Sequence, residues 1–181
     1  MKNWGWLPVT ILAAAALILL AAHTKQRSRE EEDGGVRQFT DTNAPTVIHS
    51  TQITYFHCKF STRDIPLPDS PIAGYVITLH AAADGGSFCL RRGSEADNEE
   101  AIVPDAAFWE ALQEIVSRYA LAQHNGQHYK VSGLPPDFGI DLEIRYASGE
   151  SIRASNNQDC FLPQKAMEEL VALFQTKKGG I

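Results

Sequence analysis

The stretch GIDLEIRYASGESIRAS, residues 139–155, predicts a β-hairpin. Over residues 140–146 apolar side chains alternate with charged ones, a period of two that is typical of a strand with one buried face. The segment Ala147-Ser148-Gly149 then suits a three-residue hairpin loop whose glycine adopts the left-handed conformation. We therefore expect two antiparallel strands, one on each side of this loop.

The register of the hairpin follows from the same alternation. A three-residue loop places Ile144 opposite Ile152 and Glu143 opposite Arg153, so that apolar residues share one face and charged residues the other. A two-residue loop would instead set Ile144 against Arg153 and mix the two faces. The three-residue loop is therefore expected, and it also pairs Leu142 with Ala154 and Tyr146 with Glu150.

The remaining pattern predicts an α+β fold. Three earlier strands are indicated by alternation and by β-branched and aromatic residues, and two helices by apolar residues at helical spacing. The expected order is β-β-β-α-β-β-α: about five strands in a mainly antiparallel sheet, with both helices packed on one face. The expected strands are QITYFHCKF (52–60), GYVITLHA (74–81) and SFCLRR (87–92), and the expected helices run from Pro104 to about Asn125 and from Pro163 to Lys178.

The N-terminus predicts membrane attachment. WGWLPVTILAAAALILLAA, residues 4–22, is uncharged and just long enough to span a bilayer core. We expect residues 1–22 to form a signal-anchor, or transmembrane, helix, with a cleaved signal peptide as the alternative. Residues 23–50 are charged and rich in turn residues, which predicts a flexible stalk. Residues 51–181 are then expected to form the globular domain.

Orientation is less clearly indicated. Lys2 precedes the apolar run and Lys25, Arg27 and Arg29 follow it, a count that by itself favours a cytoplasmic C-terminal part. A short tail before a first apolar segment is, however, how exported proteins begin. We expect a single-pass membrane protein with an extracytoplasmic C-terminal domain, or a protein secreted after cleavage. The expected partners are the membrane, through the N-terminal helix, and an envelope or cell-surface protein.

Several classes of function lack their sequence signals. The chain has a formal net charge of -6 and no basic stripe interleaved with aromatic residues, so no nucleic-acid partner is expected. It contains no glycine-rich phosphate loop after a strand and no GxSxG motif, and no cofactor is expected. His124 and His128 have metal-ligand spacing, but Asn125-Gly126 interrupts the helix between them. We therefore expect no metal site and place both histidines in a surface loop.

The three cysteines suggest two roles. Cys58 and Cys89 fall on the first and third expected strands, and a disulfide between them is possible if those strands are neighbours. Cys160 follows the last strand and precedes the last helix, where a small buried residue or a nucleophile would both fit. A nucleophile would need a histidine brought close by folding, such as His57 or His128.

The candidate binding residues lie in three places. The first is the polar face of the sheet, the second is the Pro/Gly loop GLPPDFG (133–139), and the third is the polar run between the last strand and the last helix. Asn and Asp in that run are also the residues that satisfy free backbone amides at such a junction. The candidates are Phe138, Glu143, Arg145, Arg153, Asn156, Asn157 and Asp159.

Residues from about Thr51 to Phe174 resemble small membrane-anchored or secreted bacterial proteins that carry no assigned function. The resemblance rests on GLPPDFGIDLEIRYASGESIRASNNQDCFLP, residues 133–163, followed by a helix. It is a likeness of pattern and implies no catalytic residue. The sequence favours a non-catalytic binding or interaction module. A cysteine-dependent enzyme that uses Cys160 with a histidine, and a structural accessory subunit of a membrane complex, are the alternatives.

Overall fold

The structure, a computed structural model, describes residues 35–62, 76–85, 88–93, 102–132 and 139–179. These residues form a seven-stranded sheet in the order β1-β5-β7-β6-β2-β3-β4. Neighbouring strands are antiparallel except β5 and β7, which are parallel. The elements are β1 (Val36–Thr40), β2 (Ile53–Ser61), β3 (Val76–Ala82), β4 (Phe88–Arg92), α2 (Ala106–Arg118), the short 3-10 helix η1 (Leu121–His124), β5 (Gln127–Val131), β6 (Ile140–Tyr146), β7 (Ser151–Asn156) and α3 (Gln164–Gly179).

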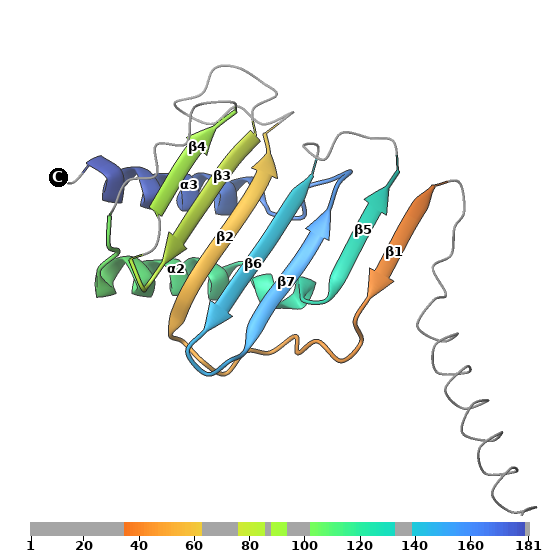
Figure 1. The fold of residues 1–181 in the computed structure, drawn as a ribbon, viewed down its shortest axis with the longest axis horizontal. Helices are drawn as coiled ribbons and strands as arrows, with labels where there is room; N and C mark the ends of the chain where they lie inside the picture. The colour runs from red at the N-terminus through yellow and green to blue at the C-terminus, as the bar shows by residue number, and fades with distance from the viewer. Residues whose placement is uncertain (1–34, 63–75, 86–87, 94–101, 133–138, 180–181) are drawn as a thin grey trace, which may run out of the picture. The chain divides into compact units, whose positions relative to one another are not determined.

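The helices α2 and α3 both lie on one face of the sheet, behind the strands in Figure 1. The opposite face, which we call the open face, is covered by no helix in the described part of the chain. This arrangement confirms the α+β class, the mainly antiparallel sheet and the two helices on one face. The two layers follow from the pattern of the central strands, such as β6 and β7, because only one side of each is apolar enough to need a cover.

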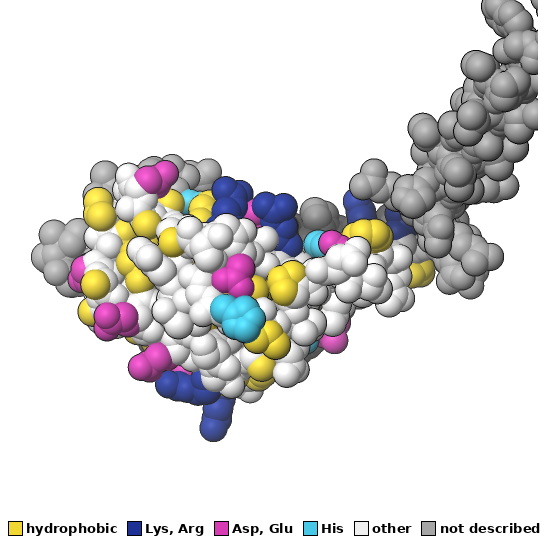
Figure 2. All heavy atoms as spheres, turned by 90° about the horizontal axis from the view of Figure 1, so that it is seen from below, with side chains coloured by type: hydrophobic (Ala, Val, Ile, Leu, Met, Phe, Trp, Pro, Cys, Tyr) yellow, Lys and Arg dark blue, Asp and Glu magenta, His cyan; other side chains and the backbone are white. Residues whose placement is uncertain are grey.

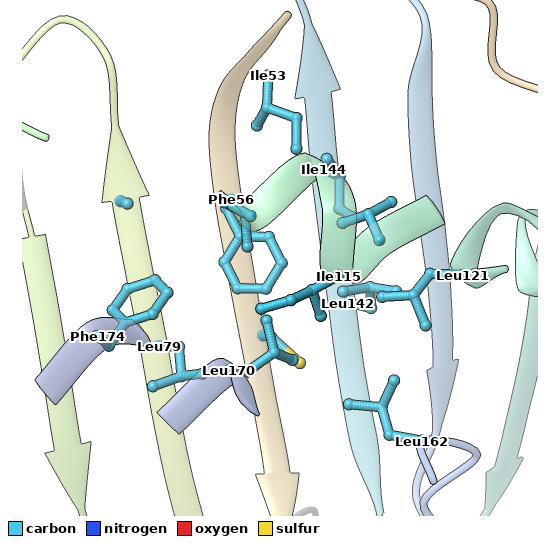
Figure 3. Packing of buried hydrophobic residues seen from close by; sticks show 14 of the residues in the cluster. Ile53, Phe56, Leu79, Ile115, Leu121, Leu142, Ile144, Leu162, Leu170 and Phe174 are labelled. Carbon is cyan, nitrogen blue, oxygen red and sulfur yellow. The ribbon is translucent and has the colours of Figure 1, made fainter. Parts of the chain in front are cut away.

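The hydrophobic core fills the space between the sheet and the helices (Figure 3). Phe174 of α3 is fully buried, and its ring centroid lies 5.1 Å from that of Phe88, 5.2 Å from that of Phe108 and 5.9 Å from that of Phe56. Burying one such side chain contributes roughly 1.5–3 kcal/mol. One aromatic residue of α3 thus joins two strands and the other helix.

The predicted hairpin is confirmed in loop and in register. Gly149 has φ +88°, the left-handed conformation that the three-residue loop requires. Its N–H donates to the Tyr146 carbonyl at 3.0 Å, and the Tyr146 N–H donates to the Glu150 carbonyl at 3.0 Å. As expected, β6 and β7 then pair Glu143 with Arg153, Ile144 with Ile152 and Leu142 with Ala154.

The first helix is shorter than predicted. Asp105 is its N-cap and accepts a hydrogen bond from the Phe108 N–H at 2.9 Å, but α2 ends at Arg118. Ala120 follows with φ 51°, a left-handed conformation that interrupts the helix before η1 begins. The last helix agrees with the prediction to within one residue at each end, because Lys177, Lys178 and the terminal glycine mark its end clearly.

The sheet has two more strands than the sequence predicts. These are β1, inside the expected stalk, and β5, which contains His128 and lies where a surface loop was expected. In both strands most side chains are exposed or half-buried, so neither has the apolar alternation that marks a strand in the sequence. They form because β7 offers a free edge to β5, and β5 in turn offers one to β1.

The described sheet therefore includes residues 36–40, which the sequence placed in the stalk. Beyond β1, the segment 41–50 runs back along the sheet and is held by hydrogen bonds. The Asp41 N–H donates to the Gly126 carbonyl at 2.8 Å, and the His49 and Ser50 N–H groups donate to the Glu150 carboxylate at 2.9 and 3.0 Å. Sequence composition alone did not indicate this segment, because backbone groups make most of these contacts.

The predicted anchor, residues 1–22, and the start of the predicted stalk, residues 23–34, lie outside the described residues. Within the described ranges, no helix combines the length and the apolar character needed to cross a bilayer. The membrane helix therefore stays a prediction from the sequence.

Asn125 is the buried polar residue that joins these parts. Its Nδ2 donates to the Pro45 carbonyl at 2.9 Å and to the Ser151 carbonyl at 2.8 Å, and its Oδ1 accepts from the Arg153 N–H at 2.8 Å. The residue is 7% exposed. One amide thus connects the segment 41–50, β7 and the turn before β5.

We expect Asn125→Ala to lower the free energy of unfolding by about 3 kcal/mol, because the buried Asn125 side chain makes three hydrogen bonds and each contributes about 1 kcal/mol. The measurement is urea denaturation followed by circular dichroism. Gln123→Ala is the matched control, since this nearby side chain is exposed, and it should change stability by less than about 0.5 kcal/mol. Equal effects of the two substitutions would contradict the assigned role of Asn125.

Candidate functional site

The open face is built from every second residue of the strands, and the registers arrange these residues in rows across the sheet. One row contains Arg153 of β7, Glu143 of β6, His57 of β2 and His80 of β3. The next row along β6 and β2 adds Arg145 and Tyr55. We call these six residues the open-face cluster: Tyr55, His57, His80, Glu143, Arg145 and Arg153. In Figure 2 the open face forms the upper border of the molecule, and several Lys and Arg side chains lie along that border.

Glu143 is the centre of the open-face cluster. Its Oε1 accepts from Arg145 Nε at 2.9 Å and from Arg153 Nε at 3.0 Å, and Arg153 Nη2 lies 3.0 Å from the same oxygen. The hydrogen bond from Arg145 is the main reason that the pKa of Glu143 is lowered. Glu143 stays ionised at neutral pH and holds both guanidinium groups in place.

The two arginines remain accessible although they are positioned. The exposed fraction of the side chain is 24% for Glu143, 51% for Arg145 and 61% for Arg153. The guanidinium carbon of Arg145 also lies 4.3 Å from the centroid of the Tyr55 ring, a cation–π contact. The carboxylate thus lies low on the sheet, and two oriented guanidinium groups face the solvent.

Two histidine rings, those of His57 and His80, lie beside these charges. The ring centroids of His57 and His80 lie 6.0 Å apart, and the Tyr55 ring meets His80 edge-on at 5.0 Å. Burial lowers the pKa of His57, and this effect exceeds the opposite effect of the Asp141 and Glu143 carboxylates. His57 is therefore neutral at pH 7 and offers one donor and one acceptor nitrogen.

This arrangement is suited to recognition of an acidic group. A guanidinium binds a carboxylate through two parallel hydrogen bonds, and the neighbouring aromatic and imidazole rings provide flat contact area. Arg and Tyr are also enriched among the residues that dominate protein interfaces. In the described part of the chain, no group of three or more His, Cys, Asp or Glu side chains could hold a metal ion.

Asn156 and Asn157, two other predicted candidates, mainly bind backbone groups. Asn156 Oδ1 accepts from the N–H groups of Gln158 and Asp159 at 2.8 and 3.2 Å. The Asn157 side chain accepts from the Val131 N–H at 2.8 Å and donates to the Val131 carbonyl at 2.9 Å. Asn157 thereby extends the pairing of β5 with β7. Both asparagines therefore have a structural role at the junction between β7 and α3. The side chain of Asp159, the third candidate in this run, is exposed.

A cleft of about 390 Å³ lies where this junction meets the open face. Its lining includes Lys59, Lys130 and Asp141 together with Asn156 and Asn157. The backbone there is closely packed: a Cβ atom on Gly139 would come within 1.7 Å of the Asn156 carbonyl oxygen, so only glycine fits. Phe138, the predicted loop candidate, lies outside the described residues.

Cys160 packs on the opposite side of the sheet from the candidate histidines. Its side chain contacts the core, and its sulfur lies 3.9 Å from Met167 Sδ. His57 and His128 both project from the open face, and His128 Nδ1 is 2.8 Å from Ser155 Oγ. Burial raises the pKa of Cys160 to about 11, which disfavours a thiolate. The geometry does not bring Cys160 together with His57 or His128.

The possible disulfide between Cys58 and Cys89 is not formed, and none of the three cysteines is part of a disulfide. The strand β3 lies between β2 and β4, so the two cysteines are separated by two strand spacings, about 10 Å. They also face opposite ways, because Cys58 pairs with Leu79 on the helix side and Cys89 pairs with His80 on the open face. A disulfide needs a Cα separation below about 7 Å.

Sequence reasoning identified half of the open-face cluster. Glu143, Arg145 and Arg153 belong to one hairpin, whose register the sequence predicts. In the expected strand 52–60, Tyr55 and His57 alternate with the apolar Phe56, Cys58 and Phe60, which places both on its polar face. Nothing in the sequence, however, shows that β2 lies next to β6. That adjacency, which brings Tyr55 under Arg145, is known only from the sheet order.

No family model, curated protein or solved structure matches this chain. In general terms the chain is an α+β protein whose mainly antiparallel sheet has one face covered by two helices and one polar face that no described helix covers.

We expect Cys160 to react slowly with iodoacetamide. A rise in pKa from 9.0 to about 11 lowers the thiolate fraction at pH 8 by about 100-fold, and half-burial slows access further. The rate is measured by mass spectrometry of the peptide that contains Cys160, in native and in urea-unfolded chains. The buried Cys58 is the internal control. Labelling of Cys160 in the native chain as fast as in urea would support the cysteine-enzyme alternative instead.

Proposed function

We propose that this chain is a non-catalytic binding module, held outside a bacterial membrane by its N-terminal helix, that recognises an acidic segment of an envelope or cell-surface protein. The observation that carries the proposal is the open-face cluster. Glu143 orients Arg145 and Arg153 beside Tyr55, on a face that no described helix covers. The apolar run at residues 4–22 supports the anchor.

A contribution to folding stability does not by itself explain why these charged side chains are arranged around Glu143. Ion pairs between half-exposed side chains contribute little to folding, because solvent screens them and both side chains lose freedom. Both arginines are nevertheless oriented by one carboxylate, and Arg145 is supported by an aromatic ring as well. Such preorganisation reduces the entropy that is lost when a partner binds.

The two alternatives have weaker support. The cysteine-dependent enzyme requires a histidine beside Cys160, whereas His57 and His128 project from the other side of the sheet. An accessory subunit would expose a continuous apolar patch. In the described ranges the exposed large apolar side chains come from three separate segments: Phe39, Val47 and Val103.

The binding face can be tested with a photo-crosslinking amino acid in intact cells. At Asp141, an exposed residue of the open face, it should form an adduct with one envelope protein. At Glu114, which is 75% exposed on α2, the same group is the matched control and should not. Substituting both Arg145→Ala and Arg153→Ala should reduce the Asp141 adduct by about tenfold or more.

Replacement of both arginines by lysine keeps the positive charges but removes the planar guanidinium groups, so it distinguishes the effect of charge from that of paired hydrogen bonds. If paired guanidinium hydrogen bonds matter, the lysine variant should restore only part of the adduct. An Asp141 adduct that is insensitive to all four substitutions, or equal yields from the two crosslinker positions, would contradict binding through the open face.

Orientation is tested separately, with an epitope tag after Ile181. External protease added to intact cells should digest the domain, because we place it outside the membrane. Protection in intact cells, with digestion after lysis, would show that the positive charges after the apolar run determine the topology.

A further inference from the structure

The strand β1 ends the sheet on one side, and in the described part of the chain no strand lies beyond it (Figure 1). The Ser132 N–H donates to the Gly35 carbonyl, and the Asp41 N–H donates to the Gly126 carbonyl. Residues with odd numbers therefore direct their backbone groups toward β5. Since these directions alternate along an antiparallel strand, the backbone groups of Val36, Gln38 and Thr40 point away from the sheet.

This edge has few of the features that prevent pairing. Its register with β5 is regular from Val36 to Thr40, with no bulge and no proline. Phe39 is 61% exposed, and its ring lies stacked on the open face against His128, with 6.1 Å between ring centroids. A regular edge with an exposed aromatic residue is a template for another strand.

We propose that two copies of this chain associate through antiparallel pairing of their β1 strands, about a two-fold axis at Gln38. Gln38 then lies opposite Gln38 of the second copy, and Val36 lies opposite Thr40. Each outward N–H of one strand meets an outward carbonyl of the other. The result is one continuous sheet across both copies.

The side chains favour this register over its neighbours. Arg37 falls opposite Phe39 of the second copy on the open face, where a guanidinium can lie over the ring. An axis at Arg37 would instead set two like charges against each other. An axis at Phe39 would leave the outward groups of Val36 without partners. Only the axis at Gln38 uses every outward group and opposes no like charges.

The proposal concerns the sheet edge and does not depend on what the open face binds. The contact is short, so it gains from any factor that keeps two copies close; attachment to one membrane, which is part of the proposed function, is such a factor. The test uses the full chain reconstituted in lipid vesicles, where both copies are present without other proteins.

Cysteines introduced along β1 and a short bifunctional thiol reagent test the register. Paired Cα atoms in an antiparallel ladder lie about 5.5 Å apart, whereas residues offset by four positions lie about 14 Å apart. Gln38→Cys alone should therefore give a cross-linked dimer. Val36→Cys alone and Thr40→Cys alone should not, but a mixture of these two variants should. The unsubstituted chain controls for its own cysteines, which are buried or half-buried.

A proline at the same position tests the hydrogen bonds. The N–H of Gln38 points outward, so Gln38→Pro removes it without removing a bond to β5. Cross-linking of surface amines should show at least fivefold less dimer for Gln38→Pro and no change for Gln38→Ala, with equal circular dichroism for both. Equal cross-linking at positions 36, 38 and 40, or dimers that persist with proline, would overturn the pairing. Either result would leave the open-face proposal intact.

Discussion

The rest of the structure depends on the burial of one face of β2 and β6 against α2 and α3. Phe56 and Ile144 are paired across these strands and fully buried, and Phe174 of α3 covers Phe56. Because side chains alternate along a strand, fixing these residues inside also fixes their neighbours outside. Tyr55 and Arg145 reach the open face for this reason, so packing of the core determines the geometry of the candidate site.

Sequence alone predicted the elements whose own residues specify them. The hairpin of β6 and β7 was predictable to the register, since alternation and the glycine of its loop agree. The edge strands β1 and β5 were not, because they are stabilised by a neighbour's free edge more than by burial of their own side chains. The same holds for the open-face cluster. The placement of Glu143, Arg145 and Arg153 on one face was predictable from the hairpin, whereas the contact of Arg145 with Tyr55 could be known only from the order of the strands in the sheet.

The β1 and β5 edge of the sheet is held by a few specific polar contacts, because these two strands bury few apolar side chains. Asn125 joins the turn before β5 to the segment 41–50, and the Glu150 carboxylate binds the other end of that segment. The hydrogen bonds that Glu150 accepts lower its pKa, so it remains ionised and keeps its acceptor oxygens at neutral pH. These two residues fix the path of the segment 41–50, which connects β1 to β2, and so help to hold β1 beside β5.

The two proposed contacts, one through the open face and one through the β1 edge, are compatible because the edge of a sheet lies at right angles to its face. Pairing of β1 strands about an axis perpendicular to the sheet would extend the sheet sideways and keep both open faces on the same side. Two sets of Arg145 and Arg153 would then face the same direction across one continuous surface. A partner with two acidic segments could engage both sets, and the second contact would form at a high effective concentration. Dimerisation would thus strengthen binding without any new contact within either copy.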